Sequence, residues 1–182
     1  EKKQYVLLNK PKNYITTSDD PRKRRTVMDL VGAACKERIY PVGRLDRQTT
    51  GVLLLTNDGE LTKKLTHPSS RVGKTYHVVL DKNVTIAHLI QLVEGIELDD
   101  GIVAADKAVY VEGASKKEIG LELHSGKNRV IRRMMEKMGY QVIKLDRVLF
   151  AGLTKKNLER GKWRFLSEKE VAFLKQLPGK RD

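Results

Sequence analysis

Residues 43–55 read GRLDRQTTGVLLL, so a polar, glycine-flanked loop leads directly into an apolar run. The unbroken apolar run Val52-Leu53-Leu54-Leu55 is typical of a central strand that is covered on both faces. The loop therefore places Asp46 at the mouth of the predicted sheet. Asp46 can be a turn residue that binds its own backbone, or it can be a carboxylate presented for chemistry. Spacing alone favours the turn residue.

Outside this stretch the chain predicts a mixture of strands and helices. Alternating apolar residues or short apolar runs predict strands over residues 5–9, 75–80, 102–110, 118–124, 142–150 and 162–166. Helical apolar spacing behind capping or turn residues predicts helices over residues 26–35, 61–65, 85–95, 128–138 and 167–177. These elements follow no regular strand–helix–strand rhythm. We therefore expect an α+β fold, with a mixed, mainly antiparallel sheet flanked by helices.

The chain carries a large positive charge. Its 182 residues include 36 Lys and Arg against 23 Asp and Glu, a net charge of +13 that favours a polyanionic partner such as nucleic acid.

No apolar run approaches the ~18 residues of a membrane span, so no membrane partner is expected. Cys35 is the single cysteine, which excludes an internal disulfide and fits a cytoplasmic location. No spare apolar helix face is apparent, which predicts a monomer.

Several kinds of site lack the residues that they need. The four histidines are scattered, without a cysteine partner or a His-x-x-x-His pair, so no metal site is expected. Neither a Walker loop nor a Gly-x-Gly-x-x-Gly motif is present, so no nucleotide cofactor is expected. A Ser-His-Asp triad stays open, although the sequence has no nucleophile elbow.

A second polar segment, GKNRVIRRM at residues 126–134, joins a glycine turn to the start of a helix and contains four cations. It can be a solvated basic face. It can also be a surface that follows a phosphate backbone, with one arginine turned inward toward a carboxylate. The spacing favours neither alternative.

Residues 43–51 and 126–134, together with Lys74-Thr75-Tyr76, resemble the signature of the RsuA-type branch of the pseudouridine synthases. Supporting matches extend along nearly the whole chain, at residues 8–12 (LNKPK), 54–61 (LLTNDGEL), 145–148 (LDRV) and 161–164 (GKWR). Residues 16–21 (TTSDDP) and 25–27 (RTV) are most similar to RluB-like members, which modify large-subunit ribosomal RNA. One departure is Val130, where family members usually carry Gln.

The resemblance implies a pseudouridine synthase fold with a central active-site cleft, formed by one catalytic domain over residues 1–178. Members often carry a small S4 RNA-binding domain ahead of the catalytic one. Because the numbering opens on Glu1 rather than Met, we expect that domain to be missing from the printed sequence. The implied reaction adds and removes nothing, so it needs no redox cofactor.

The resemblance also implies roles for individual residues. Asp46 matches the carboxylate that acts on the sugar, and Arg132 matches the arginine paired with it. Tyr76 matches the tyrosine that packs on the uracil. Alternatively, Arg132 only binds phosphate. The alternative for Tyr76 is that its ring only packs in the core. Arg44 matches a residue that helps to fill the space left when the base leaves the RNA stack. A larger set is expected to contact RNA, namely Arg22, Lys23, Arg24, Arg25, Lys74, Lys127, Asn128, Arg129 and Arg133.

Isomerisation of a uridine in large-subunit ribosomal RNA is therefore the expected function. The same chemistry on small-subunit ribosomal RNA or on tRNA is one alternative. A hydrolase that releases the base is a second. A non-catalytic factor that binds ribosomal RNA during assembly is a third, but such a factor would not need Asp46, Tyr76 and Arg132 together.

Overall fold

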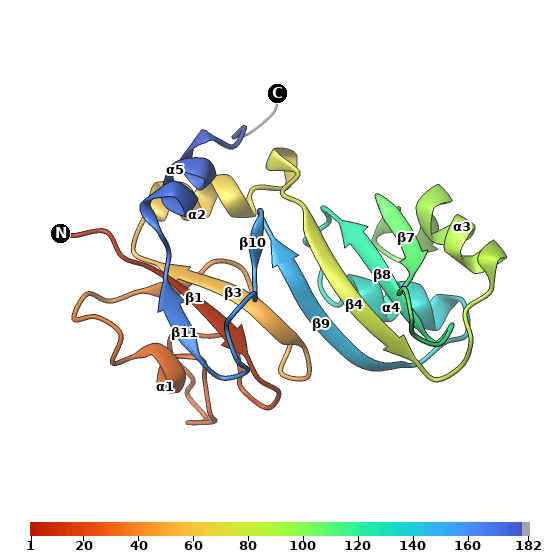
Figure 1. Cartoon of the computed structure of the whole chain (residues 1–182), viewed down its shortest axis with the longest axis horizontal. Coiled ribbons are helices and arrows are strands. Elements are labelled where there is room, and N and C mark those ends of the chain that lie inside the picture. Colours follow the sequence, from red (N-terminus) through yellow and green to blue (C-terminus); the bar gives the residue numbers. More distant parts are fainter. Residues whose placement is uncertain (180–182) are drawn as a thin grey trace.

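The computed structural model describes residues 1–179, and a nine-stranded sheet forms its centre (Figure 1). The strand order is β11-β1-β3-β9-β4-β8-β7, while β2 pairs with β3 and β10 pairs with β9. The strands are β1 (Tyr5–Lys10), β2 (Tyr40–Pro41), β3 (Thr50–Thr56), β4 (Lys74–Leu80), β7 (Lys107–Tyr110), β8 (Glu118–Leu123), β9 (Val142–Phe150), β10 (Leu153–Thr154) and β11 (Trp163–Phe165). A separate hairpin contains β5 (Ile96–Leu98) and β6 (Gly101–Val103). The expected mixed, mainly antiparallel sheet is confirmed.

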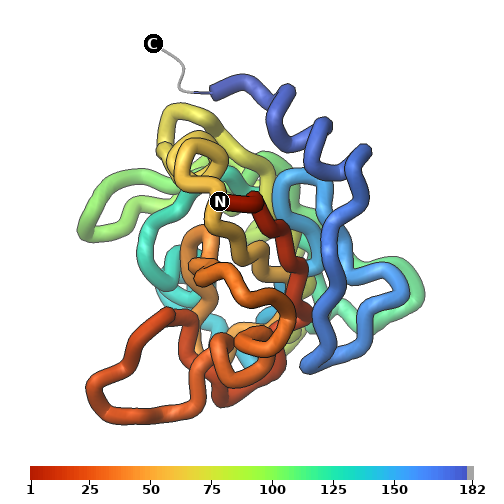
Figure 2. The backbone as a smooth tube through the Cα atoms, turned by 90° about the vertical axis from the view of Figure 1, so that its left-hand side faces the viewer, coloured from red at the N-terminus to blue at the C-terminus, as the bar shows by residue number. Residues whose placement is uncertain are grey.

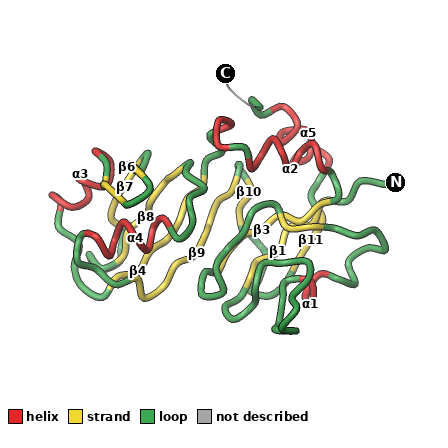
Figure 3. Tube along the Cα trace, turned by 180° about the vertical axis from the view of Figure 1, so that it is seen from behind, coloured by secondary structure: helices red, strands yellow, loops and turns green. Residues whose placement is uncertain are grey.

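Helices lie over both halves of this sheet. They are α1 (Met28–Val31), α2 (Gly59–Thr66), α3 (Ile86–Glu94), α4 (Val130–Lys137) and α5 (Glu168–Gln176), with a 3₁₀ turn η1 (Pro68–Ser70). The first half holds β1, β3 and β11 with α1, α2 and α5. The second half holds β4, β7 and β8 with α3 and α4 (Figures 1 and 3). Strand β9 runs between the halves.

The two halves of the sheet join at a short parallel contact between β3 and β9. It contains two residue pairs, Thr50 with Asp146 and Gly51 with Arg147. Gly51 has a φ of +119°, and a Cβ atom there would lie 2.1 Å from the backbone oxygen of Arg147. A side chain cannot be accommodated at that distance, so glycine is required where the halves meet.

Burial on two faces explains the apolar runs of the first half. Leu7, Val52 and Leu54 face α2 and α5, where they pack with Leu61, Leu65 and Leu174. The alternate residues form a cluster on the opposite face, consisting of Val6, Leu8, Leu53, Leu55, Val27, Val31, Ile39 and Leu45. Because both faces of β1 and β3 are covered, neither strand shows polar alternation.

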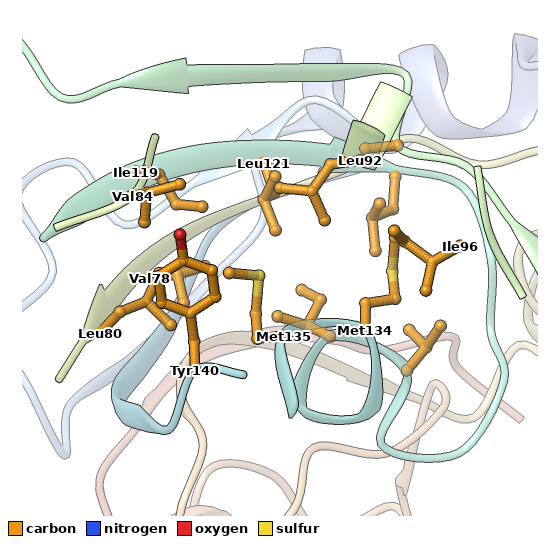
Figure 4. Packing of buried hydrophobic residues seen from close by; sticks show 14 of the residues in the cluster. Val78, Leu80, Val84, Leu92, Ile96, Ile119, Leu121, Met134, Met135 and Tyr140 are labelled. Atoms are coloured by element: carbon orange, nitrogen blue, oxygen red, sulfur yellow. The ribbon is translucent and has the colours of Figure 1, made fainter. Parts of the chain in front are cut away.

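In the second half of the sheet, β8 is buried on only one face. In β8 the buried residues Ile119, Leu121 and Leu123 alternate with more exposed positions. Met134 and Met135 reach from α4 into the same cluster (Figure 4). Period-two alternation in β8 therefore reflects one packed face and one open face.

Two predicted elements differ from the structure. The helix expected over residues 26–35 ends after one turn, because the backbone N–H of Gly32 closes that turn on Met28 and the chain then bends back toward the sheet. The single strand expected over residues 102–110 is two strands with different partners. Between them Ala105 is buried and donates its N–H to the carbonyl of Leu92 at the end of α3, which breaks the run.

The expectation that no helix has a spare apolar face was wrong, because α3 has one. Leu89 and Leu92 of α3 pack against the sheet, but Ile86, Ile90 and Val93 are 64%, 53% and 42% exposed and share one helix face. A single-layer edge helix buries only the stripe that meets the sheet, so the remaining apolar stripe faces outward. Within residues 1–179 no helix has the length and apolar character to cross a membrane.

Candidate active site

A pocket of about 320 Å³ lies where the two halves of the sheet meet. Its walls come from the loop ahead of β3, from β4 and β9, and from the segment that leads into α4. Asp46, Tyr76 and Arg129 line it, and so do the buried or half-buried cations Lys74 and Arg147. The structure therefore brings segments from separate parts of the sequence into one cleft.

The loop that presents Asp46 is held from below by Lys10. The side chain of Lys10 is fully buried at the end of β1. Its Nζ atom donates hydrogen bonds to the backbone oxygens of Thr49 at 2.7 Å, Asp46 at 3.0 Å and Pro11 at 3.1 Å. Burial lowers the pKa of Lys10 to about 8, although the Asp46 carboxylate acts in the opposite direction. The ammonium group thus fixes the loop backbone around the carboxylate.

Two guanidinium groups converge on the Asp46 carboxylate. Nη1 of Arg129 lies 3.0 Å from Oδ2 of Asp46 and donates a hydrogen bond to it. Nε of Arg132 lies 3.8 Å from the same oxygen, too far for a hydrogen bond. Arg132 instead reaches Thr49 Oγ1 at 3.5 Å. Arg132 was expected beside Asp46 and does lie there, but the direct contact belongs to Arg129.

The two arginines have different surroundings. The Arg132 side chain is 12% exposed, and its Nε atom has no hydrogen-bond partner within residues 1–179. Burial and the neighbouring Arg129 lower its pKa. Arg129 is 49% exposed and has a left-handed backbone, with a φ of +49° at the start of α4. Arg132 is therefore a buried neighbour of Asp46, whereas Arg129 lines the pocket with about half of its side chain exposed.

Tyr76 is half-buried on the pocket wall and packs against the core cluster of the second half. Lys74, two residues earlier on β4, donates from Nζ to the Ser125 carbonyl at 3.2 Å. Burial, with a smaller contribution from Arg147, lowers the pKa of Lys74 to about 8. Lys74 was expected to contact RNA, and the structure places it inside the pocket wall.

The remaining predicted RNA contacts fall into two groups. Arg22, Lys23, Arg24 and Arg25 occupy the exposed loop between β1 and α1, which extends away from the body (Figure 2). Within that loop Arg24 pairs with Asp20 at 3.1 Å, and Arg25 lies over the Tyr14 ring. Arg44 is exposed at the pocket rim.

The second group lies around the start of α4. Arg133 pairs with the Asp100 carboxylate at 2.7 Å, and Lys127 donates to the Asp100 backbone oxygen at 2.6 Å. The carbonyl of Asn128 accepts from Arg133. These residues tie α4 to the β5–β6 turn, so their cationic groups have a structural partner already.

The sequence predicted no role for Lys10, which is buried under the Asp46 loop, or for Arg147, which lines the pocket. Both fell inside segments that resemble the family, LNKPK and LDRV. Each lies in a strand where only its buried position sets it apart from the many exposed cations of this chain. The sequence offers no clear signal for either residue, because Asn9 precedes Lys10 and Asp146 precedes Arg147 in strands that already contain polar residues.

A carboxylate between guanidinium groups, in a cleft of a chain with a net charge of +13, is the arrangement of an enzyme that acts on a polyanion. The family model described as RNA pseudouridylate synthase matches residues 4–137. The chain belongs to this family of RNA-modifying isomerases.

Individual relatives agree with this assignment. The chain is 41% identical to "Ribosomal large subunit pseudouridine synthase B" of Bacillus subtilis, over 97% of this chain and 73% of the relative. It is 37% identical to the protein of the same name from Vibrio cholerae, over 92% of this chain but only 53% of that relative. A solved structure titled "Crystal structure of pseudouridylate synthase" superimposes with a TM-score of 0.85 at 28% identity, over 96% of this chain and 74% of that one.

Proposed function

We propose that this chain isomerises a specific uridine to pseudouridine in large-subunit ribosomal RNA, with Asp46 as the acting carboxylate. The observation that supports this most directly is the placement of Asp46, which contacts Arg129 at 3.0 Å in a pocket also lined by Tyr76. The names of the Bacillus subtilis and Vibrio cholerae relatives support the choice of RNA.

The reaction requires a positioned carboxylate and no cofactor. The C1′–N1 bond breaks and a C1′–C5 bond forms, while C5 loses a proton and N1 gains one. Reactant and product therefore contain the same atoms and electrons. A carboxylate can begin the reaction by attacking C1′, with the electron pair leaving on N1, or by removing a proton from the sugar. Arg129 and Arg132 orient Asp46 for this step, and Tyr76 forms the wall on which the uracil packs.

The target nucleotide must leave the RNA stack to reach such a pocket, at a cost of a few kcal/mol. Arg44 at the rim is placed to occupy the space that the base leaves. The exposed loop with Arg22 and Lys23 supplies charge that follows the RNA backbone. We further propose that the protein works as a monomer in the cytoplasm.

The test is pseudouridine formation in an unmodified large-subunit ribosomal RNA transcript, mapped by carbodiimide-dependent primer-extension stops. The wild-type protein should produce one stop that Asp46→Asn does not, because the amide can neither attack C1′ nor accept a proton. Equal stops with both proteins would remove Asp46 from the mechanism.

Parallel reactions separate the alternatives. Stops that appear only in small-subunit ribosomal RNA or only in tRNA would identify that RNA as the substrate. Free uracil in the mixture would identify a hydrolase. Tight RNA binding without a stop in any of these RNAs, in wild type and Asp46→Asn alike, would support a non-catalytic assembly factor.

A further inference from the structure

Arg147 is a buried cation that lacks a carboxylate partner. Only 3% of the residue is exposed, and no Asp or Glu carboxylate lies within 4.0 Å of it in the described part of the chain. Its Nε atom donates to the Val52 carbonyl at 3.0 Å, and its guanidinium lies 4.5 Å from the centre of the Phe150 ring. Its Nη2 atom is buried without a hydrogen-bond partner within residues 1–179. Burying a guanidinium in this way costs free energy, so stability does not explain it.

An irregularity in β9 aims Arg147 at the pocket. Along β4 and β9, Thr75 is opposite Leu149, but the next residue, Tyr76, is opposite Arg147. Val148 is the extra residue of this bulge. In a regular ladder Tyr76 would face Val148, and Arg147 would point to the other side of the sheet.

The bulge leaves Arg147 and Tyr76 on one face as a direct cross-strand pair. Side chains in such pairs are close enough to touch. The Tyr76 side chain interacts with the guanidinium and partly opposes the effect of burial, which lowers the pKa of Arg147. Both residues line the same pocket as Asp46.

We propose that Arg147 is a positioning residue for the isomerisation, which holds the hydroxyl of Tyr76 so that the phenol ring stays packed against the uracil. The inference rests on the proposed function, because it takes Tyr76 as the wall that the base contacts. A ring on a pocket wall has rotational freedom that bound substrate must otherwise remove. An arginine anchored on Val52 removes that freedom before the RNA arrives.

A purely structural role is the rival explanation. In that case Arg147 only ties β9 to β3 through the Val52 carbonyl, and its loss would lower stability without acting through Tyr76. Lys155→Met is a matched control, because Lys155 pairs with Asp146 on the opposite face of the same strand. That variant weakens the same junction but leaves the pocket face unchanged.

The first measurement needs no RNA. In protein labelled with ¹³Cζ-tyrosine, which gives six resonances, Tyr76→Phe identifies the signal of Tyr76. Arg147→Lys should move that signal, and Lys155→Met should leave it in place. An unmoved signal in Arg147→Lys that still folds would overturn the proposal. If Arg147→Lys does not fold, Arg147→Met and Arg147→Gln replace it in the same comparison.

The second measurement is single-turnover modification of the ribosomal RNA transcript by wild type, Arg147→Lys, Tyr76→Phe and the double variant. Arg147→Lys should lower the rate by about tenfold with little change in RNA affinity, and should cost less than about twofold in the Tyr76→Phe background. Equal losses in both backgrounds would mean that Arg147 acts independently of Tyr76. A wild type that modifies no uridine would instead refute the proposed function, while the resonance of Tyr76 would still decide whether the contact exists.

Discussion

The buried ammonium group of Lys10 donates a 3.0 Å hydrogen bond to the backbone carbonyl of Asp46, the residue whose side chain faces the pocket. Strand β1 therefore supports the loop ahead of β3 from inside the protein. The same Nζ atom binds the Thr49 carbonyl at 2.7 Å, so the loop is held on both sides of its turn. The position of the carboxylate depends on a residue 36 positions earlier in the chain.

Replacing Lys10 should damage both stability and activity. Lys10→Met leaves several loop carbonyls without a donor, so we expect the free energy of unfolding to fall by about 1–3 kcal/mol. The modification rate should fall by roughly tenfold or more, because the Asp46 loop loses its fixed geometry. Urea unfolding and single-turnover kinetics measure the two effects. Lys12→Met, at an exposed position nearby, serves as the control and should change neither; a wild-type rate in Lys10→Met would show that the loop positions itself.

Lys74 should make stability depend on pH. Its pKa is about 8 in the folded protein against 10.5 as the ordinary value, so between pH 8 and 10.5 the unfolded chain binds more protons. The free energy of unfolding therefore rises with pH across that window. It is lowest below pH 8, where Lys74 is charged in both the folded and the unfolded chain. We expect Lys74→Met to be more stable than wild type at pH 7, with an advantage that shrinks as the pH approaches 10.5.

Urea unfolding of wild type and Lys74→Met at pH 7, 8, 9 and 10 checks this. Lys144→Met, which removes an exposed lysine of β9, is the matched control. A stability difference that stays constant over this range would contradict the prediction. Since Lys74 lines the pocket, the stabilised variant should still lose activity on RNA.

Gly51 should tolerate no side chain. In Gly51→Ala the added Cβ would meet the Arg147 backbone oxygen at 2.1 Å, with a φ of +119° in addition. We expect a loss of several kcal/mol or failure to fold, because the β3–β9 contact must separate. Gly43→Ala also has a positive φ, of +73°, but nothing lies within 4 Å of its Cβ position. Thermal melts should therefore show a loss of only about 1 kcal/mol for Gly43→Ala. Similar losses at the two glycines would mean that the close approach is not rigid.

The basic residues should differ in their effect on the salt dependence of RNA binding. Arg22 and Lys23 are exposed and make no ion pair within residues 1–179, whereas Arg133 is paired with Asp100. Replacing Arg22 and Lys23 by Ala should reduce the slope of log K against log salt by about 1–2, as expected when two phosphate contacts are lost. Arg133→Ala should leave the slope nearly unchanged. Filter binding at several salt concentrations measures this, and an equal change in both variants would place Arg133 on the RNA.

Local patterns in the sequence predicted most of the secondary structure. The helices predicted over residues 85–95 and 167–177 are present as α3 and α5, capped by the Thr85 side chain and by a capping box of Ser167 and Glu170. The elements that were wrong depend on distant partners. The helix after Thr26 stops early because the chain returns to the sheet, and the strand before Tyr110 divides because its two parts pair with different neighbours. Periodicity carries no information about such partners.

The candidate site shows the same division. Asp46, Tyr76 and Arg132 were singled out by their resemblance to family motifs. Asp46 and Tyr76 line one pocket, and the buried Arg132 approaches Asp46 to 3.8 Å. The direct partner of Asp46, however, is Arg129, which was expected to follow the RNA backbone. Which of two neighbouring arginines reaches a carboxylate depends on the left-handed backbone at Arg129, and no spacing rule specifies that.

The sequence by itself determined the class of fold, the basic character of the protein and the segments that form its pocket, because apolar periodicity, net charge and local motifs are properties of neighbouring residues. Only the tertiary structure decided which cations are buried and what they touch. Lys10 lies under the Asp46 loop because β1 and β3 are adjacent, and Arg147 meets Tyr76 because a bulge shifts β9 by one residue. Both contacts join positions far apart in the chain, and their geometry depends on packing that no local pattern encodes.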